Sequence, residues 1–149
     1  MYIVSACLLG ENVKYSGGNN LSEAVCSFLE DKEYMPVCPE VRGGLTVPRE
    51  PCERLGDRVV NRSGRDVTRE FLEGAALTIE DVLRRYSPED IEGAILKENS
   101  PSCGYGTIHD GTFTGPLVER DGVLGERLRV LGIKVYNENN ITELIGEKI

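Results

Sequence analysis

Four short apolar runs, separated by segments with helical spacing, constrain the fold of this 149-residue chain more than any other feature. The first run, residues 2–6, is apolar and rich in β-branched residues, as buried strands are. The runs are residues 2–6, 34–38, 93–97 and 133–136. Strands that alternate with helices predict a parallel sheet. We therefore expect one α/β domain over residues 1–149, with a three-layer, mostly parallel sheet, helices on both faces, a Rossmann-like or flavodoxin-like topology and the strand order 2-1-3-4.

Capping residues mark the ends of the predicted helices. Asn20 or Ser22 is suited to begin the first helix, and Asp66 is suited to begin the second. Leucines spaced at 124, 128 and 131 predict a third helix, which Gly132 is expected to terminate. Two minor elements complete the prediction, a short strand and a final short helix, at residues 58–61 and 141–145.

Two long stretches, residues 39–57 and 98–122, show no clear period. The first holds three prolines and three glycines, and the second is also rich in glycine. Loops of this length inside a compact domain are usually functional or disordered. We expect the first stretch to be functional, because it begins beside a cysteine.

Three cysteines each follow one of the predicted core strands. Cys7 follows the first run, Cys38 ends the second, and Cys103 lies six residues after the third. If the strands are parallel, the three thiols gather at the carboxyl edge of the sheet, where open α/β sheets bind ligands. Three soft thiolates at one point indicate a metal site with a free coordination position. Taken singly, each cysteine also has a structural explanation, as a small core residue or as part of a turn.

The remaining cysteines and the single histidine are assigned no function at this stage. Cys26 lies on the apolar side of the first predicted helix and is expected in the core. Cys52 stands among acids that would raise the pKa of its thiol, and we interpret it as a bystander. His109 is interpreted as an exposed loop residue.

Composition excludes several classes of protein. The net charge of −8 argues against a nucleic-acid partner, which favours a basic face. No stretch is long and apolar enough to cross a membrane, and no signal peptide is evident, so we expect a cytoplasmic protein without a membrane partner. That compartment is reducing, which makes a disulfide framework improbable for the five cysteines.

Seven sequence blocks resemble a small bacterial and archaeal family, long labelled a domain of unknown function, whose characterised members are thiouracil desulfidases. The blocks occur in the family's order and span nearly the whole chain. They are Ser5-Ala6-Cys7-Leu8-Leu9-Gly10, Val13-Lys14-Tyr15-Ser16-Gly17-Gly18, Val37-Cys38-Pro39-Glu40, Gly43-Gly44-Leu45 with Val47-Pro48-Arg49, Gly64-Arg65-Asp66-Val67-Thr68, Ile95-Leu96-Lys97-Glu98 and Ser100-Pro101-Ser102-Cys103-Gly104.

The resemblance implies a cofactor and a ligand set. In that family three cysteines hold a cubane 4Fe–4S cluster whose fourth iron has no protein ligand. The matching positions here are Cys7, Cys38 and Cys103. Soft thiolates suit such a cluster, which aerobic preparation is expected to remove or replace.

The resemblance also implies a reaction. The open iron takes the sulfur of a thiolated pyrimidine or similar small thioamide, and hydrolysis leaves the oxo base. Glu40 corresponds to the expected proton-transfer acid, with a capping role or an ion pair to Arg42 or Arg49 as the alternative. Ser100 or Ser102 is expected to orient the substrate or the water. We expect Lys97 to offset the negative charge of the cluster.

Two other functions stay open from the sequence. A cysteine-persulfide sulfurtransferase would use Cys103 or Cys52 as nucleophile and would need no metal. A non-enzymatic module would bind metal or ligand without turnover. In the family comparison Cys52 is an unexpected cysteine, and it is read as an extra ligand, a sulfur acceptor or a residue without a role.

Overall fold

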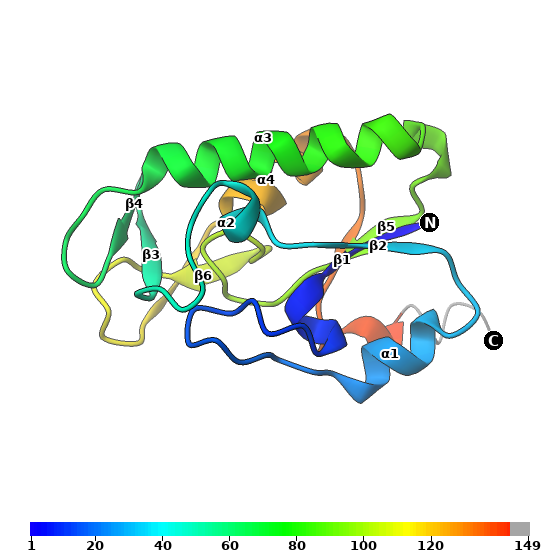
Figure 1. The fold of residues 1–149 in the computed structure, drawn as a ribbon, viewed down its shortest axis with the longest axis horizontal. Coiled ribbons are helices and arrows are strands. Elements are labelled where there is room, and N and C mark those ends of the chain that lie inside the picture. The colour runs from blue at the N-terminus through cyan, green and yellow to red at the C-terminus, as the bar shows by residue number, and fades with distance from the viewer. Residues whose placement is uncertain (144–149) are drawn as a thin grey trace.

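Residues 1–143 of the chain are described by a computed structural model, built around one parallel four-stranded sheet (Figure 1). Its strands are β1 (Tyr2–Ser5), β2 (Tyr34–Val37), β5 (Gly93–Ile95) and β8 (Val135–Tyr136). The strand order is β2-β1-β5-β8, and every pairing is parallel. In chain order this is 2-1-3-4, so the predicted fold class and strand order are confirmed.

Helices cover both faces of the sheet. Helix α1 (Glu23–Leu29) lies on one side, and α3 (Thr68–Arg85) and α4 (Val123–Val130) lie on the other (Figure 1). The Ser22 hydroxyl accepts a hydrogen bond from the Val25 amide at 3.3 Å, which confirms Ser22 as the N-cap of α1. Among the described residues, no helix is long and apolar enough to cross a bilayer.

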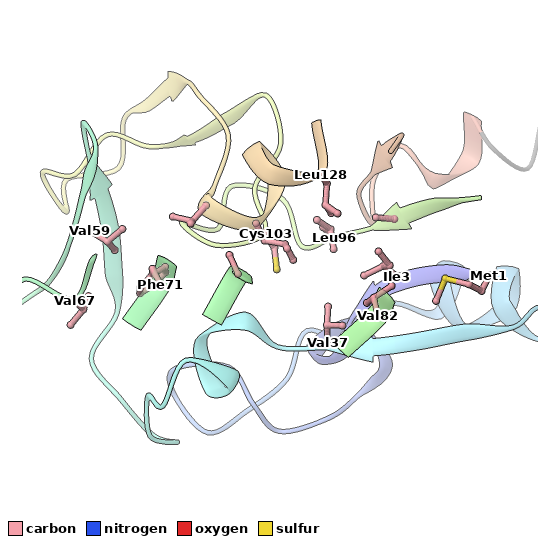
Figure 2. Close-up of a cluster of buried hydrophobic side chains, with 14 residues drawn as sticks. Met1, Ile3, Val37, Val59, Val67, Phe71, Val82, Leu96, Cys103 and Leu128 are labelled. Atoms are coloured by element: carbon pink, nitrogen blue, oxygen red, sulfur yellow. The ribbon is translucent and has the colours of Figure 1, made fainter. Parts of the chain in front are cut away.

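The alternation of side chains along β1 divides the core into two clusters. Ile3 points to the side of α3 and α4, where it joins the cluster of Figure 2. Tyr2 and Val4 point to the side of α1, and the Tyr2 ring meets Phe28 edge-on at 5.3 Å. All four residues of β1 are buried, because both of its faces are covered.

The predicted start of α3 is wrong by a small margin. The N-cap is Val67 rather than Asp66. The Asp66 carboxylate instead accepts a hydrogen bond from the Thr68 amide at 2.9 Å, so it still satisfies a free donor of the first turn. The C-terminal end falls at Tyr86, and α4 ends just before Gly132, whose φ of 75° suits glycine.

The two stretches without a period are more ordered than expected. They contain the short helix α2 (Pro39–Arg42), one strand of a first antiparallel hairpin and the whole of a second, and both hairpins lie beyond the carboxyl ends of the sheet (Figure 1). The first hairpin pairs β3 (Cys52–Leu55) with β4 (Arg58–Asn61), and β4 is the predicted short strand. The second pairs β6 (Thr107–His109) with β7 (Leu117–Glu119). Two 3₁₀ turns, η1 (Ala6–Leu9) and η2 (Pro88–Asp90), complete the fold.

The final predicted helix, residues 141–145, falls partly outside the described residues. Residues 141–143 are helical, and the rest of that prediction lies beyond them.

Helix α2 is held against α3 by a contact between two glycines. A Cβ atom added at Gly74 of α3 would lie 1.9 Å from the carbonyl oxygen of Pro39. One added at Gly43 would lie 2.0 Å from the carbonyl oxygen of Glu70. The two backbones therefore touch directly. This contact fixes α2 and, with it, the neighbouring side chains of Cys38 and Glu40.

We predict that Gly74→Ala lowers the free energy of unfolding by about 1–3 kcal/mol, because the new methyl group overpacks the contact with Pro39. Urea denaturation measures the change. The control is Glu73→Ala, an exposed neighbour in the same helix, which should change stability by less than about 0.5 kcal/mol. A Gly74→Ala protein as stable as the parent would contradict the close contact, since alanine is otherwise the better helix former.

Candidate functional site

The three predicted cysteines line one cavity of about 380 Å³ at the carboxyl edge of the sheet. Cys7 lies in η1, which directly follows β1. Cys38 follows β2 and is the N-cap of α2. Cys103 lies in the loop after β5, among the apolar side chains of the larger core cluster (Figure 2). The structure thus brings together the thiols that the sequence places at the ends of three adjacent strands.

Burial dominates the electrostatics of these thiols. Cys103 is buried, and burial raises the pKa of its thiol, which the neighbouring Cys7 and Cys38 raise further. Burial also raises the pKa of Cys7 and of Cys38, which are half-buried. Thiolates that share a desolvated cavity need a compensating positive charge, and metal ions supply one because they bind the deprotonated form.

Several groups partly offset this penalty. The Asn20 side chain and the Lys97 ammonium lower the pKa of Cys7, against the effect of burial. The backbone amides of Val41 and Glu40, at the start of α2, act in the same direction on Cys38. These groups favour the charged form of the thiols, but burial outweighs them and the pKa of both thiols stays raised.

The three thiols share one cavity but do not form a compact site for a single metal ion. Among the described residues, no group of three His, Cys, Asp or Glu side chains forms a site for one metal ion. An iron–sulfur cubane uses one thiolate per iron, so its ligands stand farther apart than ligands that share one ion. Three cysteines around a common cavity, without a compact trio, match that requirement.

The Glu40 carboxylate lies beside the thiols and is held at both oxygens. Ser102 Oγ donates to Glu40 Oε2 at 2.8 Å, and Arg49 Nε donates to Oε1 at 3.1 Å. Arg49 itself is almost fully buried and also donates to the carbonyl oxygens of Val13 and Thr46. The predicted ion pair of Glu40 therefore forms with Arg49. Arg42 instead pairs with Asp81 at the surface.

The two serines form a directed chain of hydrogen bonds. Each hydroxyl carries one hydrogen. Ser102 gives its hydrogen to Glu40, so in the 3.0 Å contact between the two hydroxyls Ser100 is the donor. Ser100 Oγ in turn accepts from the backbone amides of Ser102 and Cys103, at 3.2 and 3.1 Å. The chain runs from the backbone that carries Cys103 to the carboxylate of Glu40.

Helix α4 shapes the loop that carries Cys103. The amides of Val123 and Leu124 donate to the carbonyl oxygens of Pro101 and Ser102, at 2.9 and 2.8 Å. A Cβ at Gly122 would lie 2.7 Å from the Ser102 carbonyl oxygen, so only glycine allows this approach. Gly122 had no predicted role. The sequence feature that could have predicted this role is the change at Gly122 from a glycine-rich stretch to the helical spacing of apolar residues.

Lys97 lines the cavity and pairs with Glu138 at 2.8 Å. Its backbone amide donates to the Ser5 hydroxyl at 3.0 Å, which ties the ends of β1 and β5 together. Lys97 is therefore close enough to Cys7 to lower the pKa of its thiol, but its ammonium is paired with an acid of the protein.

The other cysteines and the histidine separate into two groups. Cys26 is half-buried on α1 with Sγ 4.0 Å from the Leu8 carbonyl oxygen, and it does not line the cavity. Cys52 does line it, and burial together with Glu40 raises the pKa of its thiol to about 12. The interpretation of His109 as an exposed loop residue is wrong, because it lies half-buried in β6 and lines the cavity. Its short strand has no apolar period that reveals this position.

Fold and site together define an α/β protein with a thiol-lined cavity at the carboxyl edge of a parallel sheet. Residues 2–140 match the model of the 2-thiouracil desulfurase family, and the chain belongs to that family. It is 37% identical to the uncharacterized protein YbbK of Bacillus subtilis, over 97% of this chain and all of the relative. It also matches the solved structure of a 4Fe–4S-dependent thiouracil desulfidase, TudS, with 42% identity and a TM-score of 0.85, over 97% of this chain and 94% of the other. The family predicted from the sequence blocks is confirmed.

We predict that Arg49→Leu destabilises the protein by about 3–5 kcal/mol, because it leaves the enclosed Glu40 carboxylate without its cation. Arg42→Leu is the matched control, since it breaks an ion pair at the surface and should cost at most about 1 kcal/mol. Chemical denaturation of both variants gives the two values. Equal losses would show that the Arg49–Glu40 pair is no more enclosed than the surface pair.

Proposed function

We propose that this protein is an iron–sulfur-dependent desulfidase that replaces the sulfur of a thiolated pyrimidine, or similar small thioamide, with oxygen. The observation that carries the proposal is the convergence of three thiols and one fixed carboxylate on a single cavity. Family membership and the description of the solved relative support the enzyme class and the cofactor.

Cys7, Cys38 and Cys103 are the residues that would hold a 4Fe–4S cluster, one thiolate to each of three irons. When bound, such a cluster supplies an iron without a protein ligand, a Lewis acid with affinity for the soft sulfur of a thione. The donor set fits the group, because it is all sulfur, desolvated and open to one cavity. Lys14, Arg62 and Lys97 also line that cavity, together with the acids Glu40, Glu53 and Glu98.

The net reaction is hydrolysis. A thione and one water give a carbonyl and hydrogen sulfide, so the carbon–sulfur bond is replaced by a carbon–oxygen bond without oxidation or reduction. Water must lose two protons in this exchange and the sulfur must gain two. A fixed proton acceptor beside the reacting carbon is therefore the main requirement on the protein.

Glu40 is the residue that we assign to this proton transfer. Its carboxylate is held by Arg49 and Ser102, so it does not turn away from the cavity when substrate enters. Ser102 lies between Glu40 and Ser100, where its hydroxyl is able to relay or orient a proton. Ser100 accepts two backbone amides and mainly builds the loop, which makes Ser102 the serine nearer to the chemistry.

The persulfide alternative is less consistent with the site. A nucleophilic cysteine needs a depressed pKa. Burial raises the pKa of both Cys103 and Cys52, the latter to about 12, so neither thiol is activated. A binding module without turnover would not require the fixed carboxylate and its serine partner inside the cavity.

We propose a cytoplasmic location and a small-molecule partner for this enzyme. All five cysteines are free, and an exposed iron is best preserved in a reducing compartment. The net charge of −8 favours a small molecule over a nucleic acid.

We predict that anaerobic reconstitution loads about four irons per chain and gives the broad visible absorption of a cubane. Cys7→Ser should lose most of this iron, because serine replaces a soft thiolate with a hard oxygen. Cys26→Ser is the matched control outside the cavity and should load like the parent. Iron and sulfide analysis of the three proteins decides the ligand assignment. A Cys7→Ser protein that reconstitutes as well as Cys26→Ser would refute it.

We predict that Glu40→Gln keeps its cluster but releases sulfide from thiouracil at least about 100-fold more slowly, since the amide keeps the shape and removes the base. Glu89→Gln, an exposed change in η2, should have no effect. The measurement is sulfide release by anaerobic, cluster-loaded protein. Undiminished turnover in Glu40→Gln would exclude Glu40 as the base.

A further inference from the structure

The two hairpins supply part of the cavity wall, beyond the carboxyl ends of the sheet (Figure 1). Cys52 and Glu53 of β3 and His109 of β6 line the cavity from this side. The three thiols proposed as cluster ligands line it from the edge of the sheet. A thione whose sulfur lies among those thiols leaves its ring to be bound by the other residues of the cavity. The polar groups of the hairpins are therefore candidates for binding the ring.

The Glu53 carboxylate is fixed at one of its two oxygens. The backbone amides of Gly111 and Phe113, in the turn between β6 and β7, both donate to Glu53 Oε1, at 3.1 and 3.0 Å. Leu55, two residues further along β3, packs on the same turn, since a Cβ atom added at Gly111 would lie 2.9 Å from the Leu55 Cβ. Glu53 thus lies between the two hairpins, and backbone donors set the position of its carboxylate.

The second oxygen of Glu53 is free to bind a ligand. Oε2 accepts no hydrogen bond from residues 1–143, and within that range the side-chain atoms both buried and unpaired are Thr78 Oγ1 and His109 Nδ1. Oε2 is therefore accessible to solvent. Because Oε1 faces the turn and Glu53 lines the cavity, Oε2 is the oxygen open to a ligand there. An ionised carboxylate only accepts hydrogen bonds, so the group that it binds is a donor.

The other acids of the cavity are less suited to this role. Glu40 has both oxygens engaged by side chains of the protein. Glu98 Oε1 accepts a hydrogen bond from the side chain of Asn139, which is exposed. Glu53 combines an open oxygen with an anchor on two backbone amides, and a polar group held in this way fixes the orientation of a ligand.

We infer that Glu53 binds the substrate, with Oε2 accepting a hydrogen bond from the N–H group beside the thiocarbonyl carbon. This assignment rests on the proposed function, because that function places a cyclic thioamide in the cavity. A carboxylate suits the N–H group of a thioamide, since hydrogen bonds to a charged acceptor are stronger than those between neutral groups. A ring held at this N–H presents the adjoining carbon–sulfur bond in a single orientation.

The first test compares two ligands that differ in one N–H group. In 4-thiouracil the N–H beside the thiocarbonyl is N3–H, which 1-methyluracil keeps and 3-methyluracil lacks. Isothermal titration calorimetry with anaerobic, cluster-loaded protein measures both dissociation constants. We expect 1-methyluracil to bind at least about tenfold more tightly, the effect of one hydrogen bond to a charged group. Equal dissociation constants for the two ligands would overturn the inference.

The second test separates recognition of the ring from the structural role of Glu53. In Glu53→Gln the backbone amides of Gly111 and Phe113 still require an acceptor, so they retain the carboxamide oxygen and leave its NH₂ group facing the cavity. The anchor between the hairpins is kept, and the melting temperature should match that of the parent. The cavity, however, then presents a donor to the N–H group of the ligand.

We expect Glu53→Gln to raise KM for 4-thiouracil about tenfold and to reduce the preference for 1-methyluracil to less than about threefold. The kcat and the iron content should stay within about twofold, because the hydrogen bond is made equally in the bound substrate and in the transition state. Glu50→Gln is the matched control, the same change at an exposed residue outside the cavity, and should behave like the parent. A Glu53→Gln protein with the KM and the ligand preference of the parent would refute the role of Glu53.

These results are distinguishable from failure of the proposed function. If the parent releases no sulfide from 4-thiouracil but prefers 1-methyluracil, and Glu53→Gln removes that preference, the binding role stands and the desulfidase proposal fails. If the parent turns over 4-thiouracil and Glu53→Gln changes neither KM nor preference, the proposed function stands and the role of Glu53 is refuted. A parent that neither turns over 4-thiouracil nor binds 1-methyluracil contradicts both.

Discussion

Parallel pairing of β1 with β2 on one side and β5 on the other is the constraint on which the site depends. Parallel strands end at the same edge of a sheet, so the residues that follow each strand meet even when they are far apart in sequence. Cys7, Cys38 and Cys103 are such residues. An antiparallel arrangement of the same strands would separate them. The core therefore builds the site, because the apolar contacts that align the strands also set the positions of the thiols.

A second layer of contacts turns this meeting point into an ordered cavity. Arg49 and Ser102 each form a hydrogen bond to one oxygen of the Glu40 carboxylate. The close contact between Gly43 and Gly74 fixes α2 against α3, and with it the position of Cys38 at the start of α2. None of these contacts is a large apolar interaction. They are hydrogen bonds and close backbone approaches, which specify orientation more than they add stability. The apolar core thus provides most of the free energy of folding, and the polar contacts around the cavity orient its side chains.

The sequence predicted the elements that carry a strong period and missed those that do not. The core strands, the cap at Ser22 and the end of α4 at Gly132 were all predictable from local chemistry. The two hairpins were not, although the strand β4 was predicted, because the other hairpin strands lack a buried apolar run, as in β7, whose three residues are all exposed. His109 was missed for the same reason. Glu40 was found through the family blocks, whereas its bond to Ser102, 62 residues away, depends on tertiary structure.

The backbone amide donors at the start of α4 bear on whether the protein keeps its fold when oxygen destroys the cofactor. They hold the Cys103 loop through backbone hydrogen bonds that involve no inorganic atom. Small zinc domains lose their fold when the metal leaves, because the metal is their core. Here the loop that carries Cys103 is tied to α4 by backbone hydrogen bonds of the protein. Oxidative loss of an iron–sulfur cluster would then leave this loop folded. Repair would require a new cluster and not a new polypeptide chain.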